Sequence, residues 1–393
     1  MTPHLTLKGA RVLRNGRLHD TVLSLADGTI TDVVGVTADL SGYDLLPGIV
    51  DLHGDAFERH IAPRPAAPFP LIDGLRGTDR DMAAHGVTTA FLAQSWSWEG
   101  GLRGADYAET VMAGLALYRS EALCDLRLQI RYETFALDTA GRLLEALRRH
   151  DVGYVIFNNH MDEPAFLAQH NPAALASWAL RAGYSTPDFL ALTEGLAARS
   201  DAVPASIAQL AQEFKNMKVR CGSHDDTDAA TRQHFDILGA DVCEFPTTAA
   251  AAQAARDLGN PVLMGAPNVA RGGSQSGNIA AIDLIRKGLC DALVSDYHYP
   301  ALSSAAFRLV DEGVMDLAAA WGMISSAPAQ IMGLTDRGTL NVGQRADVVI
   351  VNRTSRRIEG TIAAGRIAHL SGGVAAQLIG SASAVALDER RSA

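Results

Sequence analysis

The stretch Leu46-Pro47-Gly48-Ile49-Val50-Asp51-Leu52-His53-Gly54-Asp55 is an apolar run that ends in a histidine and a carboxylate. Side chains alternate between the two faces of a β-strand, so His53 and Asp55 should project to the same side, just beyond the apolar cover. Such a pair is suited to bind a metal ion, but ordinary polar strand ends show the same pattern. The rest of the chain decides between these two interpretations.

The composition of the 393 residues is typical of a soluble globular enzyme, with 48% hydrophobic and 20% charged residues. A net charge of -10 disfavours nucleic acid as a partner, because a duplex-binding protein needs a basic surface. There is no apolar run of about 18 residues and no signal-peptide pattern, so we expect a cytoplasmic protein that does not span a membrane. Whether it forms a homo-oligomer is left open.

The four cysteines, Cys124, Cys221, Cys243 and Cys290, are widely spaced along the chain. This spacing argues against a disulfide framework and against a zinc site built from thiolates. We expect them to be buried as small apolar side chains.

Both ends of the chain contain short apolar runs separated by turns. These runs cover residues 5–8, 11–13, 21–25 and 30–34 at one end, and 338–351 and 358–362 at the other. Because isolated hairpins are only marginally stable, we predict one composite β-sandwich formed by residues 1–46 and 335–393. Two independent flaps packed on the main domain are the alternative.

Between these segments, short apolar runs alternate with longer helical patterns, which favours repeated βα units and a parallel sheet. The predicted strands are 45–52, 87–93, 126–132, 154–157, 219–222, 242–245, 262–264 and 292–294, and the predicted helices include 107–119, 140–150 and 205–215. We therefore predict an α/β fold, a (β/α)8 barrel over residues 47–334, with its active site at the C-terminal ends of the strands. A doubly wound sheet is the alternative, but no Gly-x-Gly-x-x-Gly follows the first strand.

Residue types that bind metal ions follow five of the eight predicted strands. They occur in His53-Gly54-Asp55, Arg131-Tyr132-Glu133, Asn158-Asn159-His160, Ser223-His224-Asp225-Asp226 and Ser295-Asp296. One such residue alone is commonly structural, but five strand ends that converge on one face predict a metal centre. Imidazole ligands favour Zn2+, as one ion or two, with Mn2+, Fe2+ or Ni2+ as alternatives.

The predicted metal centre indicates hydrolytic chemistry. A divalent ion lowers the pKa of a bound water and polarises the oxygen of the scissile group. Asp296, at the end of the last strand, could take the proton of that water. The alternative role, a helix N-cap, is weakened because several residues separate Asp296 from the next helical pattern near Ala305.

Two loops after strands have residues suited to bind an anion. Residues 264–278 are rich in Gly, Ser and Asn, so their backbone N–H groups could line a phosphate site to which Arg271 adds a charge-assisted contact. Arg59, His60 and Arg64 add positive charge after the first strand. A flexible loop with an exposed arginine is the alternative for 264–278.

Together, the His-x-Asp strand, the pattern Gly-x-Leu-x-x-Gly-x-x-Ala-Asp at residues 338–347 and the last-strand Asp296 resemble the amidohydrolase superfamily of metal-dependent hydrolases. Within it, one family is similar to this chain, the alpha-D-ribose 1-methylphosphonate 5-triphosphate diphosphatases of the carbon-phosphorus lyase pathway. The similar stretches are 51–60, 223–227, 244–248, 264–278 and 295–297.

This resemblance implies a diphosphatase of phosphonate metabolism, which hydrolyses a ribose 5-triphosphate and releases pyrophosphate. The metal ligands that it implies are His53, Asp55, Glu133, His160, His224 and Asp296, the last also being the proton acceptor. The anionic phosphate or phosphonate substrate is then expected to contact Arg59, His60, Arg64, Arg271, Gly272, Gly273, Ser274 and Gln275.

The chain departs from the family pattern in two places. Gln275 stands where the pattern has a histidine, and residues 158–164 lack its Asp-His-Thr-Pro-Gly-Gln sequence. A neutral glutamine cannot act as a general acid for a leaving phosphate, so the exact substrate stays open. Hydrolysis of an amide, a cyclic amide or an exocyclic amine is the alternative activity, and the full ligand set disfavours an inactive scaffold.

Overall fold

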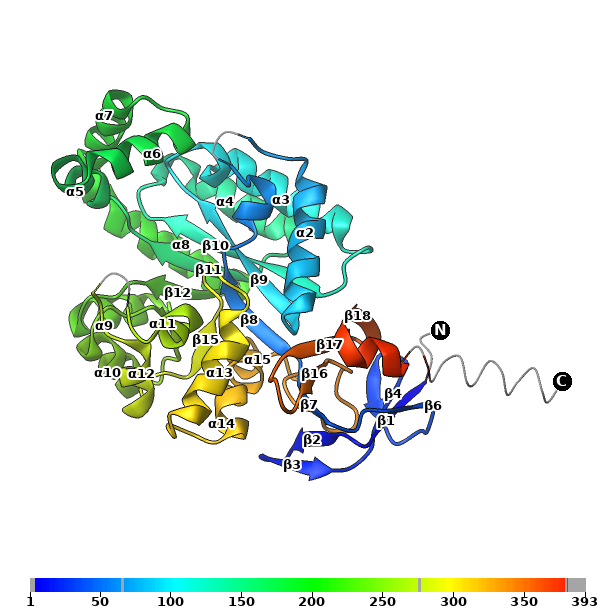
Figure 1. Ribbon diagram of the computed structural model, residues 1–393. Helices are drawn as coiled ribbons and strands as arrows, with labels where there is room; N and C mark the ends of the chain where they lie inside the picture. The colour runs from blue at the N-terminus through cyan, green and yellow to red at the C-terminus, as the bar shows by residue number, and fades with distance from the viewer. Residues whose placement is uncertain (1–3, 65–66, 275–276, 379, 381–393) are drawn as a thin grey trace.

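Eight parallel strands form the barrel at the centre of the protein (Figure 1). The computed structural model describes residues 4–64, 67–274, 277–378 and 380. The strands are β8 (Ile49–Gly54), β9 (Val87–Trp96), β10 (Asp125–Glu133), β11 (Tyr154–Asn158), β12 (Arg220–His224), β13 (Val242–Glu244), β14 (Val262–Gly265) and β15 (Ala292–Val294). They neighbour one another in chain order, which confirms the predicted (β/α)8 fold.

Amphipathic helices cover the outside of the barrel. They are α2 (Leu71–Ala84), α3 (Ala105–Tyr118), α4 (Ala140–His150), α8 (Val203–Met217), α9 (Ala229–Leu238), α10 (Ala249–Leu258), α12 (Ala281–Arg286) and α13 (Ala301–Asp311). In α4, for example, the buried residues Leu143, Ala146 and Leu147 have the three- and four-residue spacing of one helix face. The predicted helices 107–119, 140–150 and 205–215 correspond to α3, α4 and α8.

Shorter helices fill the connections. They are α1 (Glu58–Ile61), α11 (Ala266–Arg271), α14 (Leu317–Gly322) and α15 (Ser326–Ile331), with the 3-10 turns η1 (Gly101–Arg103), η2 (Leu137–Thr139) and η3 (Ser200–Ala202). Within the described ranges, no helix combines the length and the apolar character needed to cross a membrane.

The barrel closes where its first strand meets its last, along residues 51–55 and 295–296, which we call the barrel seam. Asp296 N donates to His53 O at 2.9 Å, and Asp55 N donates to Asp296 O at 2.8 Å. Below these bonds, the fully buried Asp51 accepts from Ser295 N at 2.9 Å and from Ser295 Oγ at 2.5 Å. The seam therefore fixes three of the predicted metal ligands relative to one another.

Replacing Ser295 by Ala should lower the free energy of unfolding by about 1 to 3 kcal/mol. Burial already raises the pKa of Asp51, and the variant removes a hydroxyl donor from that fully buried carboxylate. Urea unfolding measures the change. As a control, Ser304→Ala removes an exposed hydroxyl bond to Pro300 O and should stay within about 0.5 kcal/mol of the parent. Equal losses of unfolding free energy in the two variants would show that the bonds between Ser295 and Asp51 do not stabilise the barrel.

Strands from both ends of the chain form two further sheets, which lie below the barrel in Figure 1. They are β1 (Leu5–Lys8), β2 (Arg11–Arg14), β3 (Arg17–Asp20), β4 (Leu23–Ala26), β5 (Thr29–Thr31), β6 (Val36–Asp39), β7 (Tyr43–Pro47), β16 (Val348–Asn352), β17 (Ile358–Ala363) and β18 (Arg366–Leu370). One sheet has the order β18-β17-β16-β7-β2-β3, and the other has the order β5-β4-β1-β6. The two chain ends share one apolar core, as the composite β-sandwich requires. Its exact boundaries, 1–46 and 335–393, stay a prediction.

The predicted first strand, 45–52, is in fact two strands that meet at Gly48. The first, β7, pairs with β16 in the six-stranded sheet, whereas the second, β8, begins the barrel. A Cβ atom on Gly48 would lie 2.3 Å from Thr88 Oγ1 and 2.7 Å from Asp347 Cβ, so this crossing needs glycine. The apolar run concealed the break because both strands are buried.

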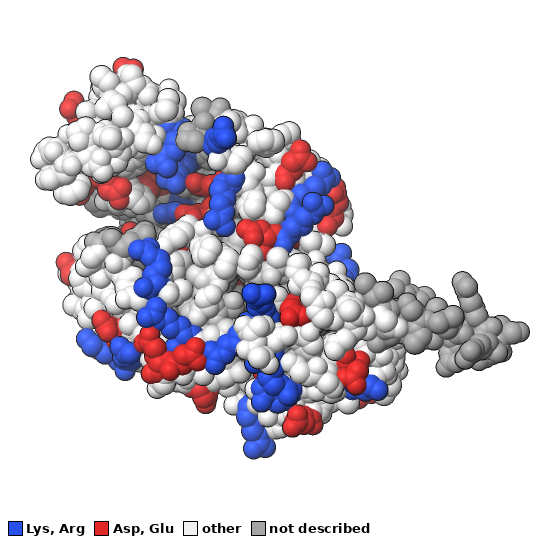
Figure 2. Space-filling view, viewed as in Figure 1, with Lys and Arg blue, Asp and Glu red and all other residues white. Residues whose placement is uncertain are grey.

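Three helices between β11 and β12 stand apart from the helices that cover the barrel (Figure 1). They are α5 (Glu163–His170), α6 (Pro172–Ala182) and α7 (Thr186–Ala197), and we call residues 163–197 the helical lobe. A small apolar cluster that includes Trp178 and Phe189 holds the lobe together. In the space-filling view, a hollow separates this lobe from the lower part of the barrel (Figure 2).

Candidate metal centre and active site

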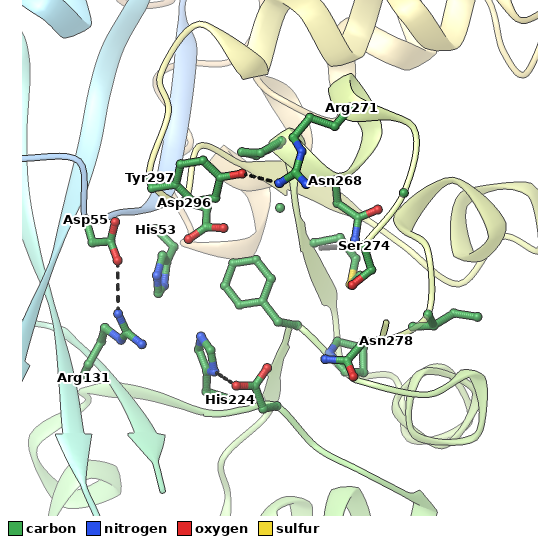
Figure 3. A pocket seen from close by; sticks show the side chains of 18 residues that line it. His53, Asp55, Arg131, His224, Asn268, Arg271, Ser274, Asn278, Asp296 and Tyr297 are labelled. Carbon is green, nitrogen blue, oxygen red and sulfur yellow. Dashed lines mark hydrogen bonds and ion pairs between the residues drawn. The ribbon is translucent and has the colours of Figure 1, made fainter. Parts of the chain in front are cut away.

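The residues His53, Asp55 and Asp296 come together at the C-terminal end of the barrel (Figure 3). Their candidate ligand atoms all lie within 4.8 Å of one another. Burial, together with the nearby charge of Asp55, raises the pKa of Asp296 to about 6. A divalent cation would offset the repulsion between the two carboxylates, so the ligand types and the charge of this group fit a metal ion.

Glu244, at the end of β13, orients His53. Its Oε2 lies 2.8 Å from His53 Nδ1, and its Oε1 accepts from Gln129 Nε2 at 2.8 Å and from Tyr154 OH at 3.4 Å. Burial favours protonation of Glu244, but the adjacent imidazole holds the pKa of this carboxyl below its usual value. With Nδ1 donating to the carboxylate, His53 can present the lone pair of Nε2 to a metal ion.

A second group of candidate ligand atoms within 4.8 Å consists of His53, His224 and Glu244. The His224 ring, at the end of β12, has its centroid 5.7 Å from that of His53. Its Nδ1 lies 2.9 Å from Asp225 Oδ2, so a carboxylate also neighbours this imidazole (Figure 3). The structure therefore brings the predicted ligands from β8, β12 and β15 to one place.

Glu133 and His160 form a separate pair. The carboxylate of Glu133, at the end of β10, contacts His160 Nδ1 and accepts from His160 N at 3.1 Å. Neither residue belongs to the two groups above, and neither lines the cavity beside His53. Their role as metal ligands, which the family resemblance implies, stays a prediction.

Three strands of the barrel end in the left-handed backbone conformation at a residue other than glycine. Asp225, Phe245 and Asp296 follow β12, β13 and β15 with φ of 60°, 53° and 54°. Each continues the hydrogen-bond ladder at 2.9 Å: Asp225 N donates to Glu244 O, Phe245 N donates to Leu263 O, and Asp296 N donates to His53 O. Such conformations are uncommon and persist where the surrounding structure enforces them, typically at functional sites.

A cavity of about 200 Å³ opens beside the candidate metal ligands His53, Asp55 and Asp296. Arg131, two residues before Glu133 on the same strand, has its Nη1 3.4 Å from Asp55 Oδ2. Arg271 donates from Nη1 to Tyr297 OH at 3.0 Å. In Figure 3, these two guanidinium groups lie on opposite sides of Asp296, so the cavity has cationic groups on both flanks.

The segment after β14 is more regular than the predicted open loop. Residues 266–271 form the short helix α11, with Pro267 in its first turn, where a missing N–H is tolerated. Gly272 ends this helix with φ of 88°, and a Cβ atom there would lie 2.9 Å from Arg308 Nη2. The helix brings Asn268 and Arg271 to the cavity, and Gly273 follows it there.

The predicted substrate contacts do not all reach the cavity beside His53. Arg271, Gly273 and Ser274 line it, as do Asn268 and Asn278, which the sequence analysis did not single out. Gly272 has the structural role of ending α11, and Gln275 lies outside the described residues.

The basic residues after β8 have different surroundings. Arg59 lines a neighbouring cavity, whereas His60 Nε2 lies 3.1 Å from Asp81 Oδ2 on α2. Arg64 is exposed and lines neither cavity. Substrate contact by His60 and Arg64 therefore has no support from these two cavities and stays a prediction.

Sequence reasoning did not assign roles to Glu244, Gln129 and Arg131. A usable signal existed for Glu244, because it is the carboxylate at the end of the sixth predicted strand. Arg131 and Glu133 are two residues apart on one strand, so the alternation of side chains predicts a shared face. Alternation also places Gln129 on this face, but its contact with Glu244, 115 positions away, could not be inferred from the sequence.

Comparison with known proteins adds three findings. The chain matches the model described as Amidohydrolase family over residues 71–369. It is 33% identical over 344 residues to the alpha-D-ribose 1-methylphosphonate 5-triphosphate diphosphatase of Escherichia coli (strain K12), across 81% of this chain and 86% of that protein. Similar solved structures include a beta-aspartyl dipeptidase from Fervidobacterium islandicum AW-1, with 15% identity, a TM-score of 0.63 and coverage of 94% of this chain and 97% of that chain. Another is a zinc-bound adenosine deaminase from Xanthomonas campestris, with 14% identity, a TM-score of 0.55 and coverage of 99% of each chain.

Proposed function

Because this chain belongs to the amidohydrolase family, we propose that it is a metal-dependent hydrolase that releases pyrophosphate from a ribose 5-triphosphate with a phosphonate group at C1. The observation that carries this proposal is the group His53, Asp55 and Asp296 beside a cavity with guanidinium groups on both flanks. The 33% identity to the Escherichia coli diphosphatase supports the choice of substrate.

His53, Asp55, Asp296 and His224 are the residues that would hold the metal, and their imidazole and carboxylate ligands favour Zn2+. When bound, a divalent ion supplies two effects: it lowers the pKa of water and it polarises a phosphoryl oxygen. Glu244 keeps His53 in the tautomer and orientation that such binding requires.

The side chains then have separate tasks in hydrolysis. Asp296 accepts a proton from the water whose oxygen forms a bond to the phosphorus next to the ribose. The bond from that phosphorus to the bridging oxygen breaks, and pyrophosphate leaves with the electron pair. Arg271, Gly273 and Ser274 line the cavity and bind this leaving group through their polar groups. The guanidinium of Arg271 can bind two phosphate oxygens at once and stabilises their negative charge.

The purified protein, supplied with Zn2+ or Mn2+, should release pyrophosphate from the phosphonate-bearing ribose 5-triphosphate. An enzyme-coupled pyrophosphate assay measures this release. A chelator should lower the rate at least about tenfold, and the metal should restore it, because the carboxylate and imidazole groups alone supply little activation of water.

Two further substrates test the alternative activity. Hydrolysis of a β-aspartyl dipeptide or deamination of adenosine, without turnover of any triphosphate, would replace the proposal by an amidohydrolase function. Release of inorganic phosphate in place of pyrophosphate would show that a different anhydride bond breaks.

A further inference from the structure

A second cavity, of about 420 Å³, adjoins the cavity beside the metal-binding group. The two share Asp55 and Tyr297 in their walls. The rest of the second cavity is built from α1, from residues 99–103 after β9, and from Arg181 and Ala182 at the end of α6 in the helical lobe. Basic and acidic side chains gather in the hollow beside that lobe (Figure 2).

Three acidic residues line this cavity, and one of them, Asp55, lies 3.4 Å from Arg131 Nη1; the two glutamates have cationic or polar partners as well. Arg103 donates to Glu58 Oε2 at 3.2 Å and has its Nη1 3.8 Å from Glu99 Oε1. Glu99 is buried and also accepts bonds from Trp178 Nε1 and Ser97 Oγ. These bonds place both carboxylates in fixed positions around Arg103.

Two further guanidinium groups belong to residues that line the cavity. Arg59 shares Asp81 with His60 and His85, and its Nη2 lies 3.5 Å from that carboxylate. Within the described part of the chain, Arg181 has no ion pair. Arg181 is exposed at the rim of this cavity, and among the cavity's described cations it is the one without an ion pair.

Aromatic contacts fix the helical lobe against the strand end that forms the cavity wall. The ring centroid of Trp98, just after β9, lies 6.4 Å from that of Trp178 and 5.8 Å from that of Phe189. The bond from Trp178 to Glu99 joins the same two segments. These contacts fix the end of α6, where the backbone of Arg181 lies about one turn after Trp178.

We infer that the second cavity binds the ribose and its anionic C1 substituent, with Arg181 as the residue that selects for that anion. This inference rests on the proposed function. The scissile anhydride must lie at the metal-binding group, and Arg271, Gly273 and Ser274 meet the leaving pyrophosphate in the first cavity. The retained part of the substrate then extends past Asp55 and Tyr297 into the second cavity, where a phosphonate balances the charge of Arg181.

The test compares two substrates, the C1-phosphonate ribose 5-triphosphate and plain ribose 5-triphosphate. Arg181→Gln should raise KM about tenfold for the first and less than about twofold for the second, with kcat nearly unchanged, because one charge-assisted contact is lost. Arg181→Lys should recover part of the difference. Arg148→Gln, which removes an exposed guanidinium paired with Glu213, is the matched control and should change neither KM.

A second readout separates the two cavities. Inhibition by inorganic pyrophosphate should be the same in Arg181→Gln and in the parent protein, because the first cavity binds this product. An equal rise of KM for both substrates, or no rise for either, would overturn the inference.

Direct binding distinguishes failure of this inference from failure of the proposed function. If the parent protein hydrolyses neither triphosphate, the proposed function is wrong. Calorimetry with ribose 1-methylphosphonate then still tests the cavity, since Arg181→Gln should bind it about tenfold more weakly. Equal affinities of variant and parent, or no binding to the parent, would reject the cavity's assignment.

Discussion

Replacing Asp296 by Asn should lower kcat at least about 100-fold while the protein stays folded and keeps most of its metal. The amide has the same shape as the carboxylate but cannot accept the proton of the attacking water. Asparagine also tolerates the left-handed backbone that residue 296 adopts, so the strand end and its bonds to His53 and Asp55 should persist. Steady-state kinetics and elemental analysis of the variant measure the two quantities.

A matched control for this variant is Asp27→Asn. Asp27 also has a left-handed backbone, with φ of 49°, but it lies in the turn between β4 and β5. The control should leave kcat unchanged. An unchanged rate in Asp296→Asn would remove Asp296 as the proton acceptor, and a rate lost together with all metal would make it chiefly a ligand.

Replacing Glu244 by Gln should weaken metal binding about 10- to 100-fold, the range observed for partners of metal-binding histidines. The variant keeps the volume of the side chain but removes the negative charge beside His53 Nδ1. Its amide can also donate to Nδ1, which would turn the other imidazole nitrogen into a donor. Competition with a chromophoric chelator measures the affinity without any need for turnover.

Activity of Glu244→Gln should recover at high metal concentration, because the residues that contact the substrate are unchanged. Glu359→Gln is the control. This carboxylate, on β17, accepts from Tyr43 OH at 2.9 Å and lies in the six-stranded sheet outside the barrel. Metal affinity of Glu244→Gln equal to that of the parent would reject the orienting role.

Much of the barrel could be predicted from the sequence, because strands buried on both faces appear as continuous apolar runs. The runs at 87–93, 126–132 and 154–157 all became strands of the barrel. The same property concealed the break at Gly48, since apolar character alone does not tell which sheet a strand joins. The resemblance to the amidohydrolase superfamily is confirmed by the family match and by the relative at 33% identity.

The helical lobe was not predicted, although its boundaries carried local signals. Asn171 and Ser185 cap α6 and α7 through their side chains, and a proline follows each within the first turn. In contrast, local sequence signals do not predict that the lobe lies beside the second cavity. That position depends on the contact of Trp178 with Glu99, two residues 79 positions apart.

The candidate metal ligands could be predicted in part. Position at a strand end pointed to His53, which lies near Asp55 and Asp296 in one group of candidate ligand atoms and near His224 in another; that these residues bind a metal stays a prediction. The same argument cannot distinguish a residue that faces the centre from one that pairs with a neighbour, as Glu133 does with His160. Whether a strand-end residue faces the barrel centre or pairs with a neighbour depends on its rotamer and on the charges across the barrel. Neither of these is visible in the sequence of one strand.

The crossing at Gly48 also sets the order in which the protein can fold during synthesis. The strand that carries His53 continues directly from β7, and β7 pairs with β16, which is synthesised only after all the barrel strands. The same strand, β8, also forms its hydrogen bonds at the seam only after the residues that follow β15 have been synthesised. The first predicted metal ligand to be synthesised is therefore among the last to be fixed, and a nascent chain without β16 leaves β7 with only β2 beside it, so that one edge of β7 is exposed to aggregation.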